Sequence, residues 1–334
     1  MAPTLPPLRY LGADDVRAAM PPLDERLRLA ERTLTALATP GSTQLPPKIA
    51  IHPRPEAAFI HAMPAHLRGD APLDDLAGMK WVAGYATNNE LGLPSISAVV
   101  VMNDAGTGLP TAILDGAPIT AQRTAAVTGV ALRHFWPRLD GRPAVVGLIG
   151  AGVQGHSHLP VLGHVLPGLE LRIFDRHAER AAELADAARR TPGIHLAEVV
   201  GDARAAAAGA NAVVTAASFT SPERRQTMTN DWLADGVSLI PIDYDTYVAA
   251  EVARTAELFL VDHTKQFLAN RDAGHFSRYP EPAAMLGRAI LDGWTRPAGR
   301  VVVSHLGVGL ADVVFGAAIV RRAEELGLGT LLKR

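Results

Sequence analysis

A glycine-rich turn between a predicted strand and a predicted helix has the clearest chemical meaning in this chain. Residues 145–155 read Val-Val-Gly-Leu-Ile-Gly-Ala-Gly-Val-Gln-Gly, so an apolar run leads directly into a G-x-G-x-x-G turn. Gly150 allows the tight turn, Gly152 lets the backbone approach a pyrophosphate, and Gly155 permits close helix–strand packing. The free N–H groups of the helix would hold the phosphates. The segment predicts a dinucleotide site, although the same pattern also occurs in turns without function.

An acid at the end of the next predicted strand supports this interpretation. The run at residues 169–175 ends in Asp175, 25 positions after Gly150, close to where a ribose-binding carboxylate belongs. Such a carboxylate favours NAD, while Arg176 directly after it could accept the 2′-phosphate of NADP. We expect NAD and leave NADP open. The expected cofactor-binding residues are Thr120, Gly150, Gly152, Val153, Gln154, Gly155, Asp175, Arg176, Ala217 and Ser218.

Two basic residues could bind an anionic substrate. Arg123 follows Thr120, a good N-cap, and a cation in the first helical turn opposes the helix dipole, so a bound carboxylate or phosphate would explain it better than stability does. It could equally be a solvated arginine or one paired with a local acid. Lys80 lies in an apolar strand-like run, where a buried ammonium needs a partner. The alternative is an edge residue that faces solvent.

Two carboxylates follow another predicted strand. Asp243 and Asp245 stand directly after the run at residues 238–242, and ligands of parallel sheets bind beyond the carboxyl ends of the strands. One carboxylate could transfer a proton while the other is structural, or both could belong to a turn that caps the next helix. His156 and His158 point to different faces of a helix and do not predict a metal site.

Composition limits the possible classes of protein. The 334 residues are 48% hydrophobic and 20% charged, which suffices for two domains with buried cores. With 32 basic and 34 acidic residues, the chain has no basic footprint for nucleic acid or an anionic membrane. The absence of cysteine excludes disulfides and thiolate chemistry. No signal pattern or apolar run of the ~18 residues needed for a membrane span is visible, so we expect a cytoplasmic protein.

The predicted elements fall into two groups. Residues 13–38 have a helical period, and short apolar runs at 48–52, 57–61, 79–83, 97–102 and 111–115 predict a mostly antiparallel sheet. A helical pattern starts at Thr120. From residue 145 strands alternate with helices, which predicts an α/β domain with a Rossmann-type doubly wound parallel sheet. A last helix is expected at about residues 309–326.

Several segments, taken together and in this order, resemble the ornithine cyclodeaminase and mu-crystallin family. They are Met63-Pro64-Ala65, the run from Lys80 to Asn88, Thr107-Gly108-x-Pro110, the run from Ile119 to Ala126, the run from Gly150 to Gln154, and Gly307-x-x-x-x-Asp312. The resemblance covers almost the whole chain. It implies a homodimer with a substrate-binding and dimerisation α+β domain formed by residues 1–120 and 305–334, and a dinucleotide-binding domain at residues 121–304.

The resemblance also implies a chemistry and a set of residues. Members of the family bind NAD or NADP and transfer hydride at the carbon that bears nitrogen in amino or imino acids. Lys80 and Arg123 match the residues that hold the substrate carboxylate, and Lys48 stands where an arginine is usual, which loses a bidentate fork. Asp245 matches the acid that handles the substrate nitrogen or its proton, with Lys80 as a second catalytic candidate. Ser95 replaces a threonine.

Four further positions depart from the family pattern. His61 stands where the ornithine enzymes present a glutamate to the substrate ammonium group, which argues against ornithine. Asp243 replaces a glycine and Tyr247 a proline, so the pocket wall differs. Pro160 should bend or shorten the helix after the glycine turn.

These observations favour an NAD(P)-dependent imine or ketimine reductase or amino-acid dehydrogenase acting on a small amino or imino acid. One alternative is an ornithine cyclodeaminase, which forms proline and releases ammonia. The other is a non-catalytic, crystallin-like protein that binds NAD(P) without turnover.

Overall fold

The computed structural model describes residues 5–54, 58–136, 139, 141–218 and 220–334. These residues form two compact units. Unit 1 comprises Met1–Arg123 and Val308–Arg334, and unit 2 comprises Thr124–Gly307. We expected domain boundaries after residues 120 and 304, and the roles given to the domains stay a prediction.

Unit 1 is built on a mostly antiparallel sheet, in agreement with the sequence pattern. The strand order is β16-β1-β7-β6-β5-β4-β2, with β3 also paired to β4. Its strands are β1 (Leu8–Leu11), β2 (Thr43–Gln44), β3 (Ile49–Ile51), β4 (Phe59–Leu67), β5 (Leu76–Gly84), β6 (Ile96–Asn103), β7 (Pro110–Asp115) and β16 (Thr330–Leu332). Short 3₁₀ turns lie at Pro72–Asp74 and Ala86–Leu91. Of the strand expected at residues 57–61, residue 57 lies outside the described residues; the observed strand β4 begins at Phe59 and continues to Leu67.

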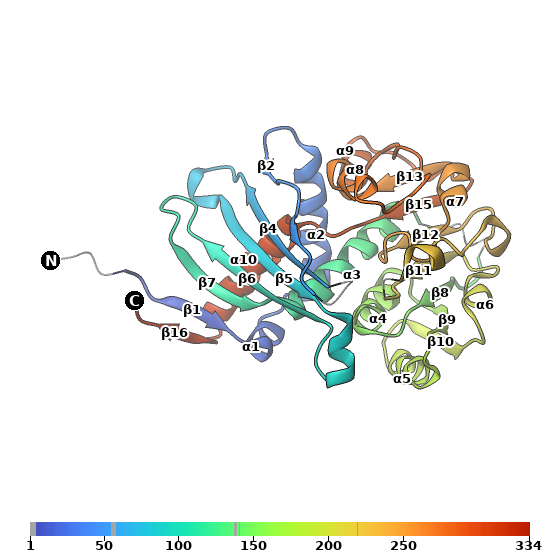
Figure 1. Ribbon diagram of the computed structural model, residues 1–334, viewed down its shortest axis with the longest axis horizontal. Coiled ribbons are helices and arrows are strands. Elements are labelled where there is room, and N and C mark those ends of the chain that lie inside the picture. The colour runs from blue at the N-terminus through green and yellow to red at the C-terminus, as the bar shows by residue number, and fades with distance from the viewer. Residues whose placement is uncertain (1–4, 55–57, 137–138, 140, 219) are drawn as a thin grey trace. The chain divides into compact units, whose positions relative to one another are not determined.

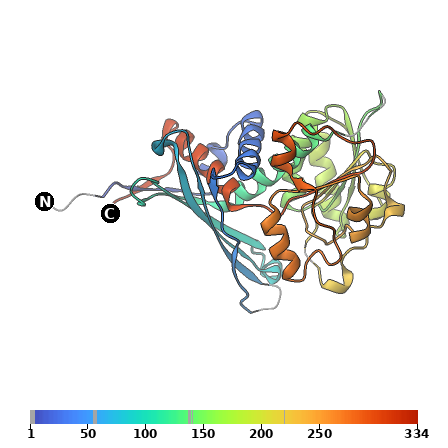
Figure 2. The ribbon, with the colours of Figure 1, turned by 90° about the horizontal axis from the view of Figure 1, so that it is seen from above.

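Helices cover one side of this sheet. Figure 2 shows α2 (Leu23–Ala38) and α10 (Gly309–Glu325) on the same side, so the last helix packs back on the first part of the chain as expected. The prediction of one helix over residues 13–38 was wrong. The chain forms α1 (Ala13–Ala18) and then α2, because Pro22 cannot continue a helix and instead occupies the N-cap of the second one.

The two faces of the unit 1 sheet differ sharply. Strand alternation places Met63, Val82, Val100 and other buried side chains on the face toward α10. The opposite face carries exposed apolar side chains in register with one another. These are Tyr10 (45% exposed), Ile49 (62%), Ile51 (53%), Trp81 (42%) and Val99 (38%).

Unit 2 contains an all-parallel sheet in the order β10-β9-β8-β11-β12-β15-β13-β14 (Figure 1). The chain moves outward from β8 to β10 and then crosses to β11, which confirms the doubly wound topology. Its strands are β8 (Val145–Ile149), β9 (Leu169–Phe174), β10 (Ile194–Val199), β11 (Ala212–Thr215), β12 (Ser238–Pro241), β13 (Leu258–Val261), β14 (Ala284–Met285) and β15 (Val301–Ser304). Its crossover helices are α4 (Val153–Val165), α5 (Ala178–Arg189), α6 (Ala203–Ala207), α7 (Ala250–Thr255), α8 (Thr264–Asp272) and α9 (Leu286–Leu291), with 3₁₀ turns at Pro222–Arg224 and Asn230–Trp232.

Helix α4 is not shortened at Pro160, contrary to one of the two effects expected there. Pro160 and His156 are both exposed, so water can reach the carbonyl that loses its helical partner. Among the described residues, no helix is both long and apolar enough to cross a membrane.

Candidate active site

The helix that carries Arg123 begins earlier than the sequence suggested. Helix α3 spans Gly116–His134, so Thr120 is not its N-cap and Arg123 does not lie in its first turn. Asp115 caps the helix instead, since its Oδ1 accepts a hydrogen bond of 2.9 Å from the N–H of Ala117. Pro118 fits the first turn because N–H groups there have no helical partner. The expected position of Arg123 beside free N–H groups was therefore wrong.

Lys80 and Arg123 share one buried carboxylate. Lys80 on β5 is 2% exposed, and its Nζ lies 2.7 Å from Oδ2 of Asp312 in the first turn of α10. Arg123 is 6% exposed, and its Nε lies 3.5 Å from Oδ1 of the same carboxylate. Neither cation is a surface residue, and their shared acid is distant in the sequence. Two cations and one anion thus form a buried cluster in unit 1.

This environment changes the acidity of Lys80. Burial lowers the pKa of Lys80 to about 8, although the attraction of Asp312 opposes it, and repulsion from Arg123 and Lys48 adds to the lowering. The ammonium group also donates to the hydroxyl of Thr120 at 3.5 Å. A lysine that titrates near neutral pH can give up and take back a proton during a reaction.

The other expected substrate residues also lie in unit 1. Lys48 is half-buried and directly precedes β3, and His61 is half-buried on β4, where its ring stacks on Phe59 with centroids 4.5 Å apart. Burial lowers the pKa of His61 to about 4, and the charges of Lys48, His52 and Lys80 act in the same direction. Ser95 lies just before β6, and its carbonyl accepts a hydrogen bond from the N–H of Tyr85.

The glycine turn of unit 2 has the geometry that a dinucleotide requires. Gly150 has a φ of 111°, and a Cβ there would lie 2.4 Å from the carbonyl oxygen of Ala216. A Cβ on Gly155 would lie 2.4 Å from the carbonyl oxygen of Gly150. A Cβ on Gly152, at the N-cap of α4, would meet nothing within 4 Å. Two glycines therefore serve packing, while the third leaves open space at the helix start, where a pyrophosphate fits.

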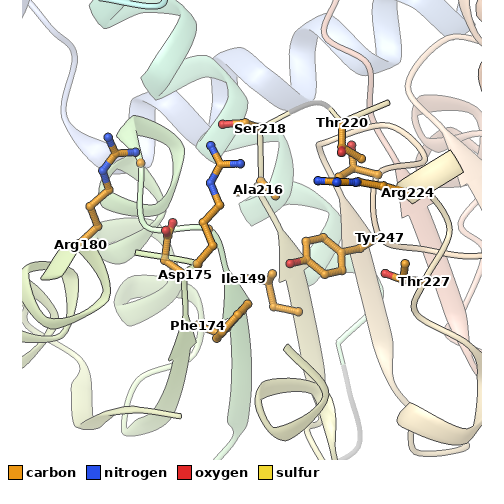
Figure 3. A pocket seen from close by; sticks show the side chains of 15 residues that line it. Ile149, Phe174, Asp175, Arg180, Ala216, Ser218, Thr220, Arg224, Thr227 and Tyr247 are labelled. Carbon is orange, nitrogen blue, oxygen red and sulfur yellow. The ribbon is translucent and has the colours of Figure 1, made fainter. Parts of the chain in front are cut away.

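A pocket opens beside this turn, at the carboxyl ends of β8, β9, β11 and β12. Figure 3 shows Tyr247 and Arg224 on one side of it, opposite Asp175 and Arg180. The crossover from β10 to β11 makes this the topological switch point of the sheet, where such folds bind ligands. The lining residues are Ile149, Gly150, Gly152, Phe174, Asp175, Arg176, Arg180, Ala216, Ala217, Ser218, Thr220, Arg224, Thr227, Thr246 and Tyr247.

Asp175 is held in place by the backbone. Its Oδ2 accepts the N–H of Ala151 at 2.7 Å, and its Oδ1 accepts the N–H of His177 at 2.9 Å. Each carboxylate oxygen keeps a second lone pair, so Asp175 can still accept hydrogen bonds from ribose hydroxyls. Arg176 and Arg180 are exposed beside it, where either can reach a phosphate. The residues of this pocket fit a nicotinamide dinucleotide.

Asp243 and Asp245 have opposite environments. Asp243 is 2% exposed, accepts a hydrogen bond of 2.6 Å from the hydroxyl of Thr215 and one of 3.2 Å from the N–H of Ala217. Burial raises the pKa of Asp243 to about 7 despite these bonds. Because Ala217 lines the pocket, the hydrogen bond from its N–H to Asp243 fixes the position of this part of the pocket wall.

Asp245 lies in a polar network with a strained backbone. Its carboxylate accepts the N–H of Phe276 at 2.9 Å and lies 3.2 Å from Nδ1 of His275. The pKa of Asp245 is lowered: burial alone would raise it, but His275, Phe276 and Arg225 outweigh burial. Asp245 is therefore ionised at neutral pH. Gln226, Tyr244 and Phe276 around it have φ values of 59°, 59° and 52°, a left-handed conformation that recurs at functional sites.

Six of the ten expected cofactor residues line the pocket; Thr120, Val153, Gln154 and Gly155 do not. Thr120 lies beside Lys80 instead, and Val153 is 72% exposed at the start of α4. Sequence reasoning missed the pocket arginines Arg180 and Arg224, which carry no motif. It also missed the role of Asp312, although the spacing Gly307-x-x-x-x-Asp312 had drawn attention to that residue.

Comparison with known proteins identifies the family of the chain. The model of the ornithine cyclodeaminase/mu-crystallin family matches residues 17–320. The nodulation efficiency protein NfeD of Rhizobium meliloti is 35% identical over 332 residues, which cover 98% of each chain. Delta(1)-pyrroline-2-carboxylate reductase 1 of Burkholderia multivorans is 33% identical over 188 residues, which cover 56% of this chain and 58% of that protein.

A solved structure shares the fold. Thermococcus litoralis Delta(1)-pyrroline-2-carboxylate reductase, in complex with NADH and L-proline, aligns with a TM-score of 0.82 at 24% identity and covers 96% of this chain and 99% of its own. With the match of the family model over nearly the whole length, the chain belongs to the ornithine cyclodeaminase/mu-crystallin family.

Proposed function

We propose that the protein is an NAD(P)-dependent oxidoreductase that acts on a small amino or imino acid. The buried cluster of unit 1 carries this proposal. Lys80 and Arg123 are two cations around one described acid, Asp312, so a substrate carboxylate would complete the charge balance. The dinucleotide pocket of unit 2 supplies the redox partner. Membership of the family supports the combination.

In the reduction of an imino acid, each of the proposed substrate residues would have a distinct role. Arg123 and Lys80 hold the carboxylate of an imino acid, with Lys48 as a further cation. A reduced nicotinamide bound in the pocket of unit 2 would supply a hydride for the imine carbon. The electron pair of the C=N bond moves to nitrogen, which takes up one proton. Lys80 is the better donor of that proton, because its pKa is about 8 whereas Asp245 is ionised. Asp245 would then orient the nitrogen.

NAD is the preferred cofactor. Asp175 stands at the end of β9 with free lone pairs for the ribose hydroxyls and would repel a 2′-phosphate. Arg176 and Arg180 could offset that repulsion, so use of NADP stays open.

A homodimer is the proposed assembly. The open face of the unit 1 sheet carries five large exposed apolar side chains in register, and a second copy of this chain could cover them. The family resemblance also implies a dimer. The mass in solution tests this: a monomer at micromolar concentration would contradict it.

Ornithine cyclodeamination is the second candidate, because the family includes it. In that reaction the cofactor is reduced and reoxidised within one turnover, and ammonia leaves. His61 argues against it, because a ring with a pKa of about 4 beside Lys48 and Lys80 offers no anion to a substrate ammonium group. The buried, ion-paired Lys80 and Arg123 likewise argue against a protein that binds NAD(P) without turnover.

One experiment separates these functions. Purified protein is mixed with NADH or NADPH and a series of cyclic and open-chain imino acids, and with NAD⁺ or NADP⁺ and the matching amino acids, including ornithine. Nicotinamide absorbance and released ammonia are followed in parallel. Steady oxidation of the reduced cofactor by an imine is expected. Ammonia from ornithine without net change of the cofactor would overturn the proposal, and so would cofactor binding with no turnover of any substrate.

A further inference from the structure

Four basic side chains share one face at the edge of the unit 1 sheet. In the antiparallel pairing, Ala50 of β3 lies opposite His61, and His61 lies opposite Val82 of β5. Strand alternation then places Lys48 and His52, which flank β3, on the same face as His61 and Lys80. This is the face toward α10, whose first turn contributes Asp312. The face therefore carries three basic side chains, Lys48, His52 and His61, in addition to the Lys80 that would bind the substrate α-carboxylate together with Arg123.

Lys80 and His61 do not lie directly opposite each other on β5 and β4. Lys80 is opposite Met63, two residues along β4 from His61, so Lys80 and His61 are diagonal neighbours. Diagonal Cα atoms of an antiparallel pair are about 7–8 Å apart. A substrate whose α-carboxylate is held at Lys80 and Arg123 would direct its side chain along the strands toward His61, Lys48 and His52.

The charged groups that lower the pKa of His61 are all basic side chains. Burial contributes most to the low pKa of the imidazole, about 4, but Lys48, His52 and Lys80 each lower it further. The same field that disfavours a proton on this ring disfavours a substrate ammonium group and favours a second anion. Coulomb attraction between a carboxylate and a partly buried cation is also stronger than the attraction between exposed groups.

Building on the proposed function, we infer that the substrate is a short amino or imino dicarboxylic acid, of four or five carbons, whose side-chain carboxylate binds at Lys48, His52 and His61. The reaction at the α-carbon is unchanged: hydride adds to the imine carbon, nitrogen takes the electron pair and one proton, and the second carboxylate stays intact. The neutral ring of His61 does not repel this group and can donate a hydrogen bond to it, so His61 determines specificity without taking part in the chemistry.

The test compares matched pairs of substrates. The kcat/KM for NAD⁺ reduction is measured with aspartate against alanine and with glutamate against norvaline. The reverse reaction uses the imines that oxaloacetate, 2-oxoglutarate, pyruvate and 2-oxovalerate form with ammonia. We expect the dicarboxylic member of each pair to have at least a tenfold higher kcat/KM. A preference for the monocarboxylic member, for ornithine or for lysine would overturn the inference while the proposed function stands. If no member of any series is turned over, the proposed function fails as well.

Variants of the proposed second carboxylate site test the same inference through substrate preference. Binding of substrate analogues tests it without turnover. In Lys48→Gln and His61→Glu the preference for the dicarboxylate over the monocarboxylate should fall at least tenfold, more in His61→Glu because it adds an anion. Lys333→Gln is the control: this exposed lysine follows β16, at the opposite edge of the same sheet, and its loss should leave the preference unchanged. With NAD⁺ bound, succinate should bind at least tenfold more tightly than butyrate to the wild type. Equal affinities, or an unchanged preference in both site variants, would contradict the assignment.

Discussion

The two proposed binding regions of this protein are built in different ways. The pocket of unit 2 comes from turns that directly follow parallel strands, and the key turn, residues 150–155, is one continuous stretch of sequence. The charged cluster of unit 1 joins Lys80, Arg123 and Asp312, which lie on β5, α3 and α10. The first site depends on local backbone geometry, and the second depends on tertiary packing and charge balance. Substitutions should therefore affect the two sites by different physical routes.

Two alanine substitutions in the glycine turn should have the largest effects, of opposite kinds. Gly150→Ala places a Cβ 2.4 Å from a backbone oxygen at a φ of 111°, which should cost roughly 2–6 kcal/mol of folding free energy. Gly152→Ala has open space and should fold normally, but its methyl group would hinder the pyrophosphate and weaken NADH binding on the order of 10- to 200-fold. Thermal unfolding and fluorescence titration with NADH check the pair. Equal behaviour of the two variants would contradict this account of the turn.

Removal of the shared acid tests the cluster of unit 1. Asp312→Ala leaves Lys80 and Arg123 buried without their anion and should destabilise the protein by about 3–5 kcal/mol. Asp186→Ala is the control, because its ion pair with Arg189 is exposed, and it should change stability by about 0.5 kcal/mol or less. Chemical denaturation of both variants gives the comparison. A loss for Asp312→Ala no larger than that of the control would mean that the cluster does not need its carboxylate.

The pH dependence of turnover probes the same cluster. Lys80 is protonated below its pKa of about 8 and neutral above it, so imine reduction should fall roughly tenfold per pH unit on the alkaline side. Lys80→Arg should lower the rate and remove this decline, since arginine stays protonated. The measurement is kcat/KM for a reducible imine from pH 6 to pH 10. A profile that is flat to pH 10 in the wild type would remove Lys80 as the proton donor.

The smallest expected effect concerns Asp243 in unit 2. Its folded pKa of about 7 exceeds the unfolded value of 3.8, so its contribution to stability is complete below the unfolded value and is lost as pH rises through 7. Asp243→Asn removes the charge; its amide oxygen can still accept from the N–H of Ala217, while its NH2 group can donate to the hydroxyl of Thr215. The stability of the variant relative to the wild type should rise by roughly 2.5 kcal/mol between pH 5 and pH 8. Unfolding in denaturant at both pH values tests this; a difference independent of pH would contradict it.

The contrast between the units also explains what the sequence could predict. The glycine turn, Asp175 and the parallel strands were visible because each is a local pattern. The start of α3 was misjudged, because small residues and Pro118 in its first turn leave a weak periodic signal. The break at Pro22 was visible in the sequence, since proline cannot continue a helix, but the apolar period on both sides of it outweighed that signal in the prediction. The pairing of Asp312 with Lys80 and Arg123 had no local signal, since packing of α10 on the sheet creates it.

The central claim is that unit 1 binds the substrate carboxylate and unit 2 binds the cofactor. One variant tests it most directly: Arg123→Ala, assayed for NADH affinity and for imine reduction side by side with the wild type. The account predicts that NADH binds with unchanged affinity while kcat/KM for the imine falls by at least 100-fold, about 2.7 kcal/mol. An unchanged kcat/KM, or a loss of NADH binding equal to the loss of turnover, would contradict the division of tasks between the two units.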